Sequence, residues 1–249
     1  MNIGIIVQAR MGSTRLPGKI LRPFYQDKSI LDILLDKLHN VEGTKIIVAT
    51  STSPNNDELE KYLLQRGEQV YRGSENDVLA RFIGAAETYG IDAIIRICSD
   101  NPFIDYEGVN LLIEKAKESD ADYIGFQING MPSIKTHFGF WGEYVTLDAL
   151  KKVRDTSDDG IVHEHVTIYI YTHPDEYCCK WVECPEFLQG RDDIRLTIDT
   201  EKDMENAQTV FSNLSKENES FGLRDVVTYL ESHTELRQSM EQIIAENSK

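Results

Sequence analysis

The sequence has few cysteines, only four in 249 residues, and they show neither zinc spacing nor a disulfide framework. Cys178 and Cys179 are adjacent, so on a strand their side chains would point to opposite faces. Reduced thiols of this kind are typical of cytoplasmic proteins, and we expect that location. The chain must therefore rely on a hydrophobic core, for which its 41% hydrophobic content is sufficient.

Long apolar runs and an excess of basic charge are also missing. No apolar run reaches the length of a transmembrane helix, and residues 3–7 are too few for the core of a signal peptide. The formal net charge is −16 at pH 7, and a negative field repels phosphate backbones and anionic lipid. We therefore expect neither nucleic acid nor a membrane as a partner.

No acidic residue precedes Asp27, whereas Arg10, Arg15, Lys19 and Arg22 all lie in that first segment. A basic segment in an acidic chain indicates a local anion site. These charges share a loop with glycines and small residues, so an anion site is favoured over an ordinary solvated basic face.

Short apolar runs alternate with amphipathic stretches in the first half of the chain. Strands are predicted at residues 3–7, 45–50, 69–71 and 91–98, and helices at 29–38, 57–65, 76–89 and 109–118. This order, with nearly continuous apolar strands, predicts an α/β fold, a Rossmann-like three-layer α/β/α core with a mostly parallel sheet. Ligands bind such sheets beyond the carboxyl ends of the strands, so the following loops carry the candidate site.

The second half is less regular. Strands are predicted at residues 121–126, 138–145, 177–182 and 194–198, with helices at 147–153 and from Lys202 onward. Residues 162–172 are rich in β-branched and aromatic side chains, which suits a strand or a buried helix, and both stay open. No composition break divides the chain, so we predict a single domain, residues 1–249, with a small β extension suited to homodimer formation.

The loop after the first predicted strand has the composition of a phosphate-binding loop. Its glycines allow close backbone approach, its hydroxyl groups donate hydrogen bonds, and its basic side chains form charge-assisted ones. The candidate nucleotide ligands in this loop are Gln8, Arg10, Gly12, Ser13, Thr14, Arg15 and Lys19. We expect the loop to be exposed to solvent, so that Lys19→Ala would weaken nucleotide binding without changing stability.

This loop differs from a Walker A motif. Five residues separate Gly12 from Gly18, where a Walker A motif has four, and Ile20 replaces its Ser or Thr. Pro17 also fixes the backbone before the second glycine. A P-loop NTPase is disfavoured, and so is a dinucleotide-binding fold, because G-x-G-x-x-G is absent.

The segment from Gln8 to Lys19 resembles the signature loop of the sugar cytidylyltransferases, which act on 3-deoxy-manno-octulosonate, acylneuraminate and spore-coat polysaccharide precursors. In that family the loop wraps the triphosphate of CTP, and Arg10, Arg15 and Lys19 fall on the positions that neutralise it. The resemblance implies the nucleotide-diphospho-sugar transferase fold and transfer of CMP from CTP to a sugar acid or related small acceptor. Pyrophosphate would be released, with Arg15 and Lys19 as the catalytic residues.

The resemblance continues into the next strands. Residues 46–50 resemble the family strand whose end approaches the base, which makes Thr50 a candidate ligand. Residues 70–82 are similar to the spore-coat branch, and Arg72, at a predicted strand end, is a further candidate.

Two acidic residues match the metal ligands of the family. Asp100 follows a predicted strand, with Pro102 fixing the next turn and Ser99 replacing a family glycine. Asp199 follows the strand predicted at residues 194–198. An ordinary helix cap would also explain Asp199, but the resemblance favours a metal site at both residues, with Mg²⁺ as the cofactor.

Two other patterns have ordinary structural explanations. Asp77 and Arg81 are four residues apart on a predicted helix, so an ion pair explains them as well as a nucleotide contact does. His163 and His165 would face one side of a strand, which suits zinc, but no third ligand is evident. The run 163–167 resembles the spore-coat branch, where it belongs to the substrate or subunit side.

The acceptor region departs from the family pattern. Trp141 stands where an Asp is usual, although Glu143 matches, so the family acceptors do not carry over directly. A sugar-1-phosphate guanylyl- or uridylyltransferase is the first alternative. A glycosyltransferase is the second, and such enzymes normally have an Asp-x-Asp turn where this chain has Asp100-Asn101-Pro102. The retained Arg, Lys and Asp residues argue against a non-catalytic nucleotide sensor.

Overall fold

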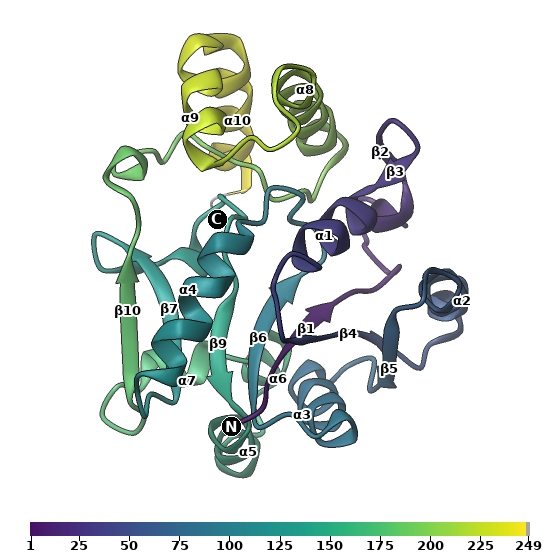
Figure 1. The fold of residues 1–249 in the computed structure, drawn as a ribbon, viewed down its shortest axis with the longest axis vertical. Helices are drawn as coiled ribbons and strands as arrows, with labels where there is room; N and C mark the ends of the chain where they lie inside the picture. Colours follow the sequence, from purple (N-terminus) through teal and green to yellow (C-terminus); the bar gives the residue numbers. More distant parts are fainter. Residues whose placement is uncertain (248–249) are drawn as a thin grey trace.

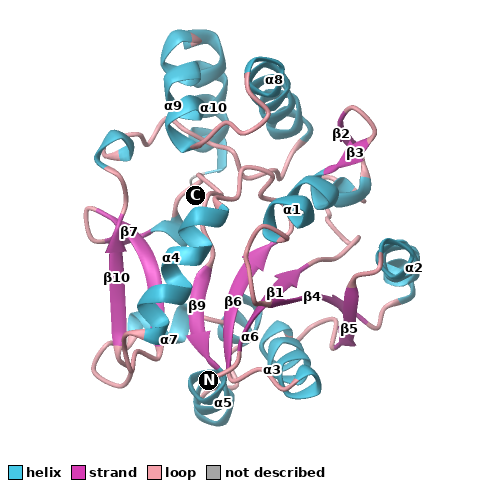
Figure 2. Ribbon diagram, viewed as in Figure 1, coloured by secondary structure: helices cyan, strands magenta, loops and turns pink. Residues whose placement is uncertain are grey.

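One eight-stranded sheet forms the centre of the protein, in a computed structural model that describes residues 1–247 (Figures 1 and 2). Its strand order is β10-β7-β9-β6-β1-β4-β5, with β8 paired to β7. The strands are β1 (Ile3–Gln8), β4 (Lys45–Ser51), β5 (Gln69–Gly73), β6 (Ala93–Cys98), β7 (Tyr123–Ile128), β8 (Met131–Pro132), β9 (Glu143–Thr146) and β10 (Cys179–Glu183). Only β8 and β9 pair antiparallel within this sheet, so the prediction of a mostly parallel sheet is confirmed.

Helices cover both faces of the sheet (Figure 1). The helices are α1 (Ile30–Leu38), α2 (Asp57–Arg66), α3 (Val78–Tyr89), α4 (Tyr106–Lys117), α5 (Leu147–Thr156), α6 (Gly160–His165), α7 (Ile168–Thr172), α8 (Glu201–Glu217), α9 (Leu223–Ser232) and α10 (Thr234–Asn247). One hydrophobic cluster joins the sheet to α1, α2, α4 and α8, and another joins it to α3, α5, α6 and α7. Along β1, Ile5 and Val7 face the first cluster and Ile6 faces the second, as the period of two requires. The three-layer prediction is confirmed.

Local signals in the sequence explain several helix ends. Ser29 caps α1: its hydroxyl accepts the Asp32 N–H at 3.2 Å, and the Asp32 carboxylate accepts the Ser29 N–H at 2.9 Å. Gly67 closes α2 with a φ of 84°, a conformation that glycine adopts without strain. Within residues 1–247, none of the helices combines the length and the apolar character needed to cross a membrane.

Most differences from the predicted elements lie in the second half of the chain. Residues 194–198 are not a strand, because their N–H groups reach isolated loop carbonyls: Leu196 donates to His137 at 2.8 Å and Ile198 to Asp100 at 3.2 Å. Residues 162–172 are helical, in α6 and α7, and the helix predicted from Lys202 is divided into three. The short hairpin of β2 (Pro23–Tyr25) and β3 (Lys28–Ser29) was not predicted.

The order of the strands places the candidate site. From β1 the chain continues to β4 and β5 on one side, whereas β6 pairs with β1 on the other side. Loops that leave such a switch point diverge and leave a crevice between them. Gln8 and Cys98 are register partners at the ends of β1 and β6, so the loop 8–19 and the Asp100 turn begin side by side.

Candidate functional site

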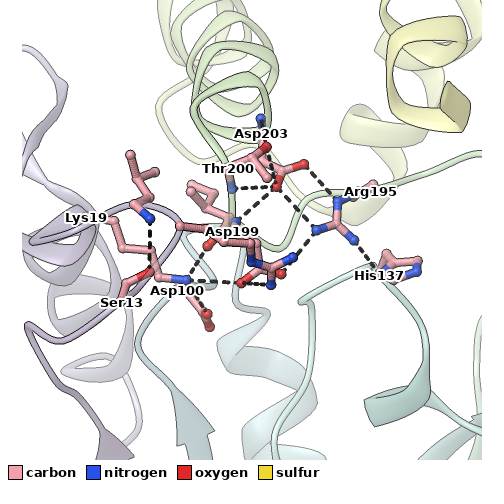
Figure 3. A network of polar contacts seen from close by, with 11 residues as sticks. Ser13, Lys19, Asp100, His137, Arg195, Asp199, Thr200 and Asp203 are labelled. Carbon is pink, nitrogen blue, oxygen red and sulfur yellow. Dashed lines mark hydrogen bonds and ion pairs between the residues drawn. The ribbon is translucent and has the colours of Figure 1, made fainter. Parts of the chain in front are cut away.

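Lys19 lies at the centre of the candidate site (Figure 3). Its Nζ donates to Asp100 Oδ2 at 2.8 Å, to Asp199 Oδ1 at 3.3 Å, and to the carbonyl of Ile198. The Lys19 side chain is only 10% exposed, whereas those of Asp100 and Asp199 are 28% and 30% exposed. Two carboxylates that are far apart in the sequence therefore converge on one cation at the edge of solvent.

The charges around Lys19 reinforce one another. Burial lowers the pKa of Lys19, but Asp100 and Asp199 outweigh that effect and raise it overall. Burial likewise raises the pKa of Asp199, and the positive charges of Lys19 and Arg15 more than reverse this, so that its pKa is lowered. Arg15 Nη2 lies 3.4 Å from Asp199 Oδ1 on the exposed side. Lys19 and Asp199 are therefore both ionised at neutral pH.

Asp199 is held in place by residues of the following turn. The buried Asp203 accepts the backbone N–H groups of Asp199 at 3.0 Å and Thr200 at 2.8 Å. Arg195 donates from Nε to Asp203 at 2.8 Å and from Nη2 to Asp199 Oδ2 at 3.1 Å. Thr200 is the N-cap of α8, so the view of Asp199 as the helix cap is wrong. The Asp199 carboxylate therefore takes no part in capping and is directed toward Lys19 and Arg15.

Arg195, Asp203 and His137 were not predicted as site residues. The spacing Thr200-x-x-Asp203 is a capping-box pattern and offered a local signal for Asp203. Arg195 also donates from Nη1 to His137 Nδ1 at 2.7 Å, so that nitrogen carries no proton. Burial, and then the charge of Arg195, lower the pKa of His137, which agrees with a neutral imidazole.

The loop 8–19 is closed by its own backbone. The Gly18 N–H donates to the Met11 carbonyl at 3.1 Å, and Ser13 Oγ accepts the Leu16 N–H at 3.2 Å. Gly18 has a φ of 67°, the left-handed region that favours glycine. This turn directs Lys19 inward, so the expectation that Lys19 is solvent-exposed is wrong.

The other predicted loop residues line the outer side of the same turn. Arg10, Thr14 and Arg15 are exposed, whereas Gly12 is half-buried beside Asn55. Gln8 ends β1 and accepts a hydrogen bond from Arg96 Nη2 at 3.3 Å. The structure therefore brings Arg15, Lys19, Asp100 and Asp199 into direct contact and leaves the remaining loop residues beside them.

The buried side-chain amide of Asn56 holds the loop 8–19 against the ends of β4 and β5. Asn56 accepts the Met11 N–H at 2.9 Å and donates to Ser51 Oγ at 2.7 Å, and Ser51 in turn donates to Glu75. Asn56 is fully buried. No local pattern indicated this residue, because Met11, Ser51 and Glu75, which complete the network, come from three other segments.

Thr50 and Arg72 lie further along the same wall. Thr50 is fully buried in β4, and its Oγ1 has no hydrogen-bond partner within the described residues. The Arg72 guanidinium reaches the carbonyls of Ser51 at 2.9 Å and Ser53 at 3.0 Å, and Glu60 at 2.7 Å. Arg72 thus ties the loop after β4 to β5, and the structure does not bring it to the Lys19 group.

Asp77 and Arg81 do not form the ion pair that their spacing suggests. Asp77 Oδ1 accepts the Ala80 N–H at 2.8 Å, which caps α3, and its Oδ2 lies 2.9 Å from His163 Nδ1. Arg81 instead donates from Nη1 to the Ser74 carbonyl at 2.5 Å. The N-cap position explains the difference, because it turns the Asp77 carboxylate back toward the start of the helix.

Comparison with known proteins identifies the family. The sequence model of the cytidylyltransferases matches residues 4–244, nearly the whole chain. The chain belongs to the cytidylyltransferase family. The family that the loop resemblance implied is confirmed, and so is the reaction class, transfer of CMP from CTP. The guanylyl-, uridylyl- and glycosyltransferase alternatives do not agree with this match.

This cytidylyltransferase is similar in sequence and in structure to other members of the family. It is 35% identical over 216 residues to the spore coat polysaccharide biosynthesis protein SpsF of Bacillus subtilis, which covers 84% of this chain and 86% of that protein. It is 27% identical over 190 residues to an 8-amino-3,8-dideoxy-manno-octulosonate cytidylyltransferase of Shewanella piezotolerans, covering 69% and 75%. A cytidylyltransferase structure from Leptospira borgpetersenii superposes with a TM-score of 0.83 at 29% identity, covering 96% and 97%.

Two residues noted for the acceptor side of this cytidylyltransferase are buried. Trp141 stacks on Phe126 with ring centroids 4.7 Å apart and donates to Asp105 at 3.3 Å, so it belongs to the core. Glu143 is 2% exposed and pairs with Arg96 at 2.6 Å. Both side chains are therefore buried away from any acceptor. Trp141, which stands where the family usually has an Asp, packs in the core.

Proposed function

We propose that this cytidylyltransferase binds CTP together with Mg²⁺ between the loop 8–19 and the carboxylates of Asp100 and Asp199. The convergence of these carboxylates on Lys19 carries the proposal. The acceptor is a sugar acid, and the product feeds surface polysaccharide synthesis, as the names of the relatives suggest. The chain works as one nucleotidyltransferase domain, and the homodimer stays a prediction.

The chemistry of the site suits a magnesium ion. The Lys19 ammonium bonds to both carboxylates, and hard oxygen atoms of this kind are the ligands that Mg²⁺ prefers. Residues 1–247 contain no group of three or more His, Cys, Asp or Glu side chains arranged as a metal cage. Mg²⁺ usually combines one or two carboxylates with water and substrate phosphates, so two carboxylates are enough. Once bound, Mg²⁺ neutralises triphosphate charge and orients the substrate.

The chain's own residues position the triphosphate and stabilise its charge. An acceptor oxygen forms a bond to the α-phosphorus, the bond from that phosphorus to the bridging oxygen breaks, and pyrophosphate leaves. Lys19 and Arg15 stabilise the charge that develops on the leaving oxygens. Backbone N–H groups at Gly12, Ser13 and Thr14 hold phosphate oxygens, assisted by Gln8 and Arg10. Positioning and electrostatics are sufficient, so no side-chain nucleophile is needed.

The wall formed by β4 and β5 accepts the base. Thr50 contributes a buried hydroxyl, and Arg72 acts by fixing the loop that follows β4.

The four cysteines are free thiols, which supports a cytoplasmic location.

The decisive experiment measures pyrophosphate release with each of the four NTPs, with and without Mg²⁺, across sugar acids and sugar phosphates. We expect turnover with CTP and a sugar acid only when the metal is present. Asp100→Asn and Asp199→Asn should abolish metal-dependent turnover, while Asp27→Asn, the same charge change at an exposed site, should not. A preference for a sugar phosphate would overturn the acceptor class, and full activity of Asp100→Asn would overturn the metal site.

A further inference from the structure

The imidazole of His163 lies between two hydrogen-bond acceptors. Its Nδ1 is 2.9 Å from Asp77 Oδ2, and its Nε2 is 2.8 Å from the Ser157 carbonyl oxygen. A carbonyl oxygen only accepts, and an ionised carboxylate only accepts, so both ring nitrogens must carry protons. The geometry therefore requires an imidazolium, and we call this arrangement the His163 bridge.

The His163 bridge joins α6 to the start of α3. Asp77 is the N-cap of α3 and follows β5, so it belongs to the wall assigned to the nucleotide. His163 lies on α6, and Ser157 lies in the turn before that helix. A break in the bridge would remove this polar link and leave α6 held to α3 by apolar packing.

The backbone directly after α6 is strained. Val166 has a φ of 58° and a ψ of −56°, and the Thr167 N–H donates to the His165 carbonyl at 2.6 Å. These values describe a γ-turn with positive φ, which is rare and unfavourable for a β-branched residue. Strain of this kind persists only where the surrounding structure enforces it. Val166 is fully buried, and the His163 bridge is one of the contacts that anchor the turn.

The strained turn also delivers a hydroxyl to a buried carboxylate. Thr167 Oγ1 donates to Glu143, with 3.0 Å to Oε1 and 3.1 Å to Oε2. Glu143 pairs with Arg96, and Arg96 Nη2 reaches Gln8, the first residue of the phosphate-binding loop, at 3.3 Å. Contacts thus run without a gap from α6 to that loop.

We propose that His163 is a positioning residue, which in its protonated form fixes α6 and the Val166 turn against the nucleotide wall and thereby, through Glu143 and Arg96, helps to position Gln8 at the start of the phosphate-binding loop. The catalytic part of this inference rests on the proposed function. The structural part, a charged bridge between α3 and α6, does not.

The pH dependence follows from the neighbours of His163. The Ser157 carbonyl raises the pKa of His163 first, burial lowers it, and the carboxylates of Asp77 and Asp158 raise it further, so the pKa is raised overall. A raised pKa in the folded protein means that the bridge is complete below the ordinary His value near 6.5. It is lost as the pH rises through the higher pKa of the folded state.

A structural test needs no substrate. Nitrogen-15 NMR of the ring should show two protonated nitrogens at about pH 6, with a midpoint above the ordinary value of about 6.5. Asp77→Asn keeps an N-cap side chain, so α3 should stay folded while the His163 midpoint falls. The protection of amides in residues 160–167, measured relative to the intrinsic exchange rate at each pH, should fall above the midpoint in the wild type and not in Asp77→Asn. A single protonated nitrogen at about pH 6, or an unchanged midpoint in Asp77→Asn, would refute the bridge.

A kinetic test addresses the positioning role. His163→Gln retains one donor but no charge, and we expect the KM for CTP to rise roughly five- to twenty-fold, with kcat changed much less. The wild-type KM for CTP should rise with pH through the His163 midpoint, and that of the variant should not. His173→Gln, at the C-cap of α7, is the matched control, because among the described residues its ring bonds only within its own turn. A KM for CTP and a pH profile that are the same in His163→Gln as in the wild type would disprove the role, whereas inactivity of the wild type toward sugar acids would count against the proposed function alone.

Discussion

Lys19 and Asp199 are 180 residues apart in the sequence, yet the Nζ atom of one lies 3.3 Å from the Oδ1 atom of the other. Asp100 approaches the same ammonium at 2.8 Å from a third segment. Without that positive charge the two carboxylates would face each other in a partly buried site, where repulsion is poorly screened. Lys19 therefore has a structural role in addition to the proposed catalytic one.

Lys19→Ala should lower both stability and turnover. Removal of the ammonium takes the ion pair from Asp100 and leaves Asp199 with only Arg15 and Arg195, which we expect to cost about 2–3 kcal/mol of unfolding free energy in the absence of metal. Mg²⁺ should restore much of this loss, because it binds the same oxygen atoms. Thermal unfolding with and without Mg²⁺ measures both effects.

The control for that variant is Lys28→Ala, which removes an exposed lysine paired with Asp36. Exposed ion pairs contribute little, so this change should leave stability and turnover nearly unaltered. Equal stability of Lys19→Ala and the wild type in metal-free buffer would contradict the structural role.

Arg15→Ala should weaken CTP binding without affecting the folding of the protein. Its side chain is 52% exposed, so the variant should fold normally, while loss of charge-assisted bonds to the triphosphate weakens CTP binding roughly ten- to a hundred-fold. Arg22→Ala removes a similarly exposed arginine that pairs with Glu201. Calorimetric titration with CTP should show a large loss only for Arg15→Ala, and equal losses in both variants would indicate a general charge effect.

Short-range patterns predicted much of the fold and pointed to part of the candidate site. Apolar runs identified β1, β4 and β6, because strands buried on both faces need apolar residues at every position. Loop composition pointed to Arg15 and Lys19. The family resemblance added Asp100 and Asp199, although the strand predicted before Asp199 does not form. The inward direction of Lys19 could not be predicted, because it depends on how the loop closes at Gly18.

The remaining residues depend on tertiary contacts that no local pattern encodes. Asn56 is recognisable only once three segments surround it. Residues 194–198 have the composition of a strand, but their N–H groups meet loops and not a ladder. For residues 162–172, β propensity competed with burial, and these residues form helices that pack on other helices, α6 on α3 and α7 on α5 and α6.

Acid should remove the contribution of Asp199 to stability. Its pKa is lowered in the folded state by Lys19 and Arg15, which outweigh the opposite effect of burial. A lowered pKa gives stability that is present above the ordinary value near 3.9 and is lost as the pH falls through the folded value. The stability difference between wild type and Asp199→Asn should therefore shrink below about pH 4 in metal-free denaturant titrations. A difference that is constant with pH, as we expect for Asp27→Asn, would contradict this reading.

Asp203 should influence Mg²⁺ binding indirectly, by positioning Asp199 and Arg195, without contacting the metal or CTP. It is 1% exposed and bonds to the Asp199 backbone and to Arg195, so Asp203→Asn removes a buried charge that holds both. We expect a stability loss of about 3 kcal/mol and an apparent Mg²⁺ affinity that is roughly ten- to a hundred-fold weaker. Asp225→Asn is the matched control, because Asp225 has the same capping-box position in α9 but is exposed.

A comparison of Asp203→Asn with Asp225→Asn separates the effect of helix capping from the effect of positioning Asp199. Asp225→Asn should cost about 1 kcal/mol at most and leave the Mg²⁺ dependence of turnover unchanged. The measurement is pyrophosphate release against Mg²⁺ concentration, at a temperature where both variants are fully folded by circular dichroism. If Asp203→Asn loses stability but keeps the wild-type Mg²⁺ dependence, Asp203 only caps α8, and Arg195 alone must orient Asp199.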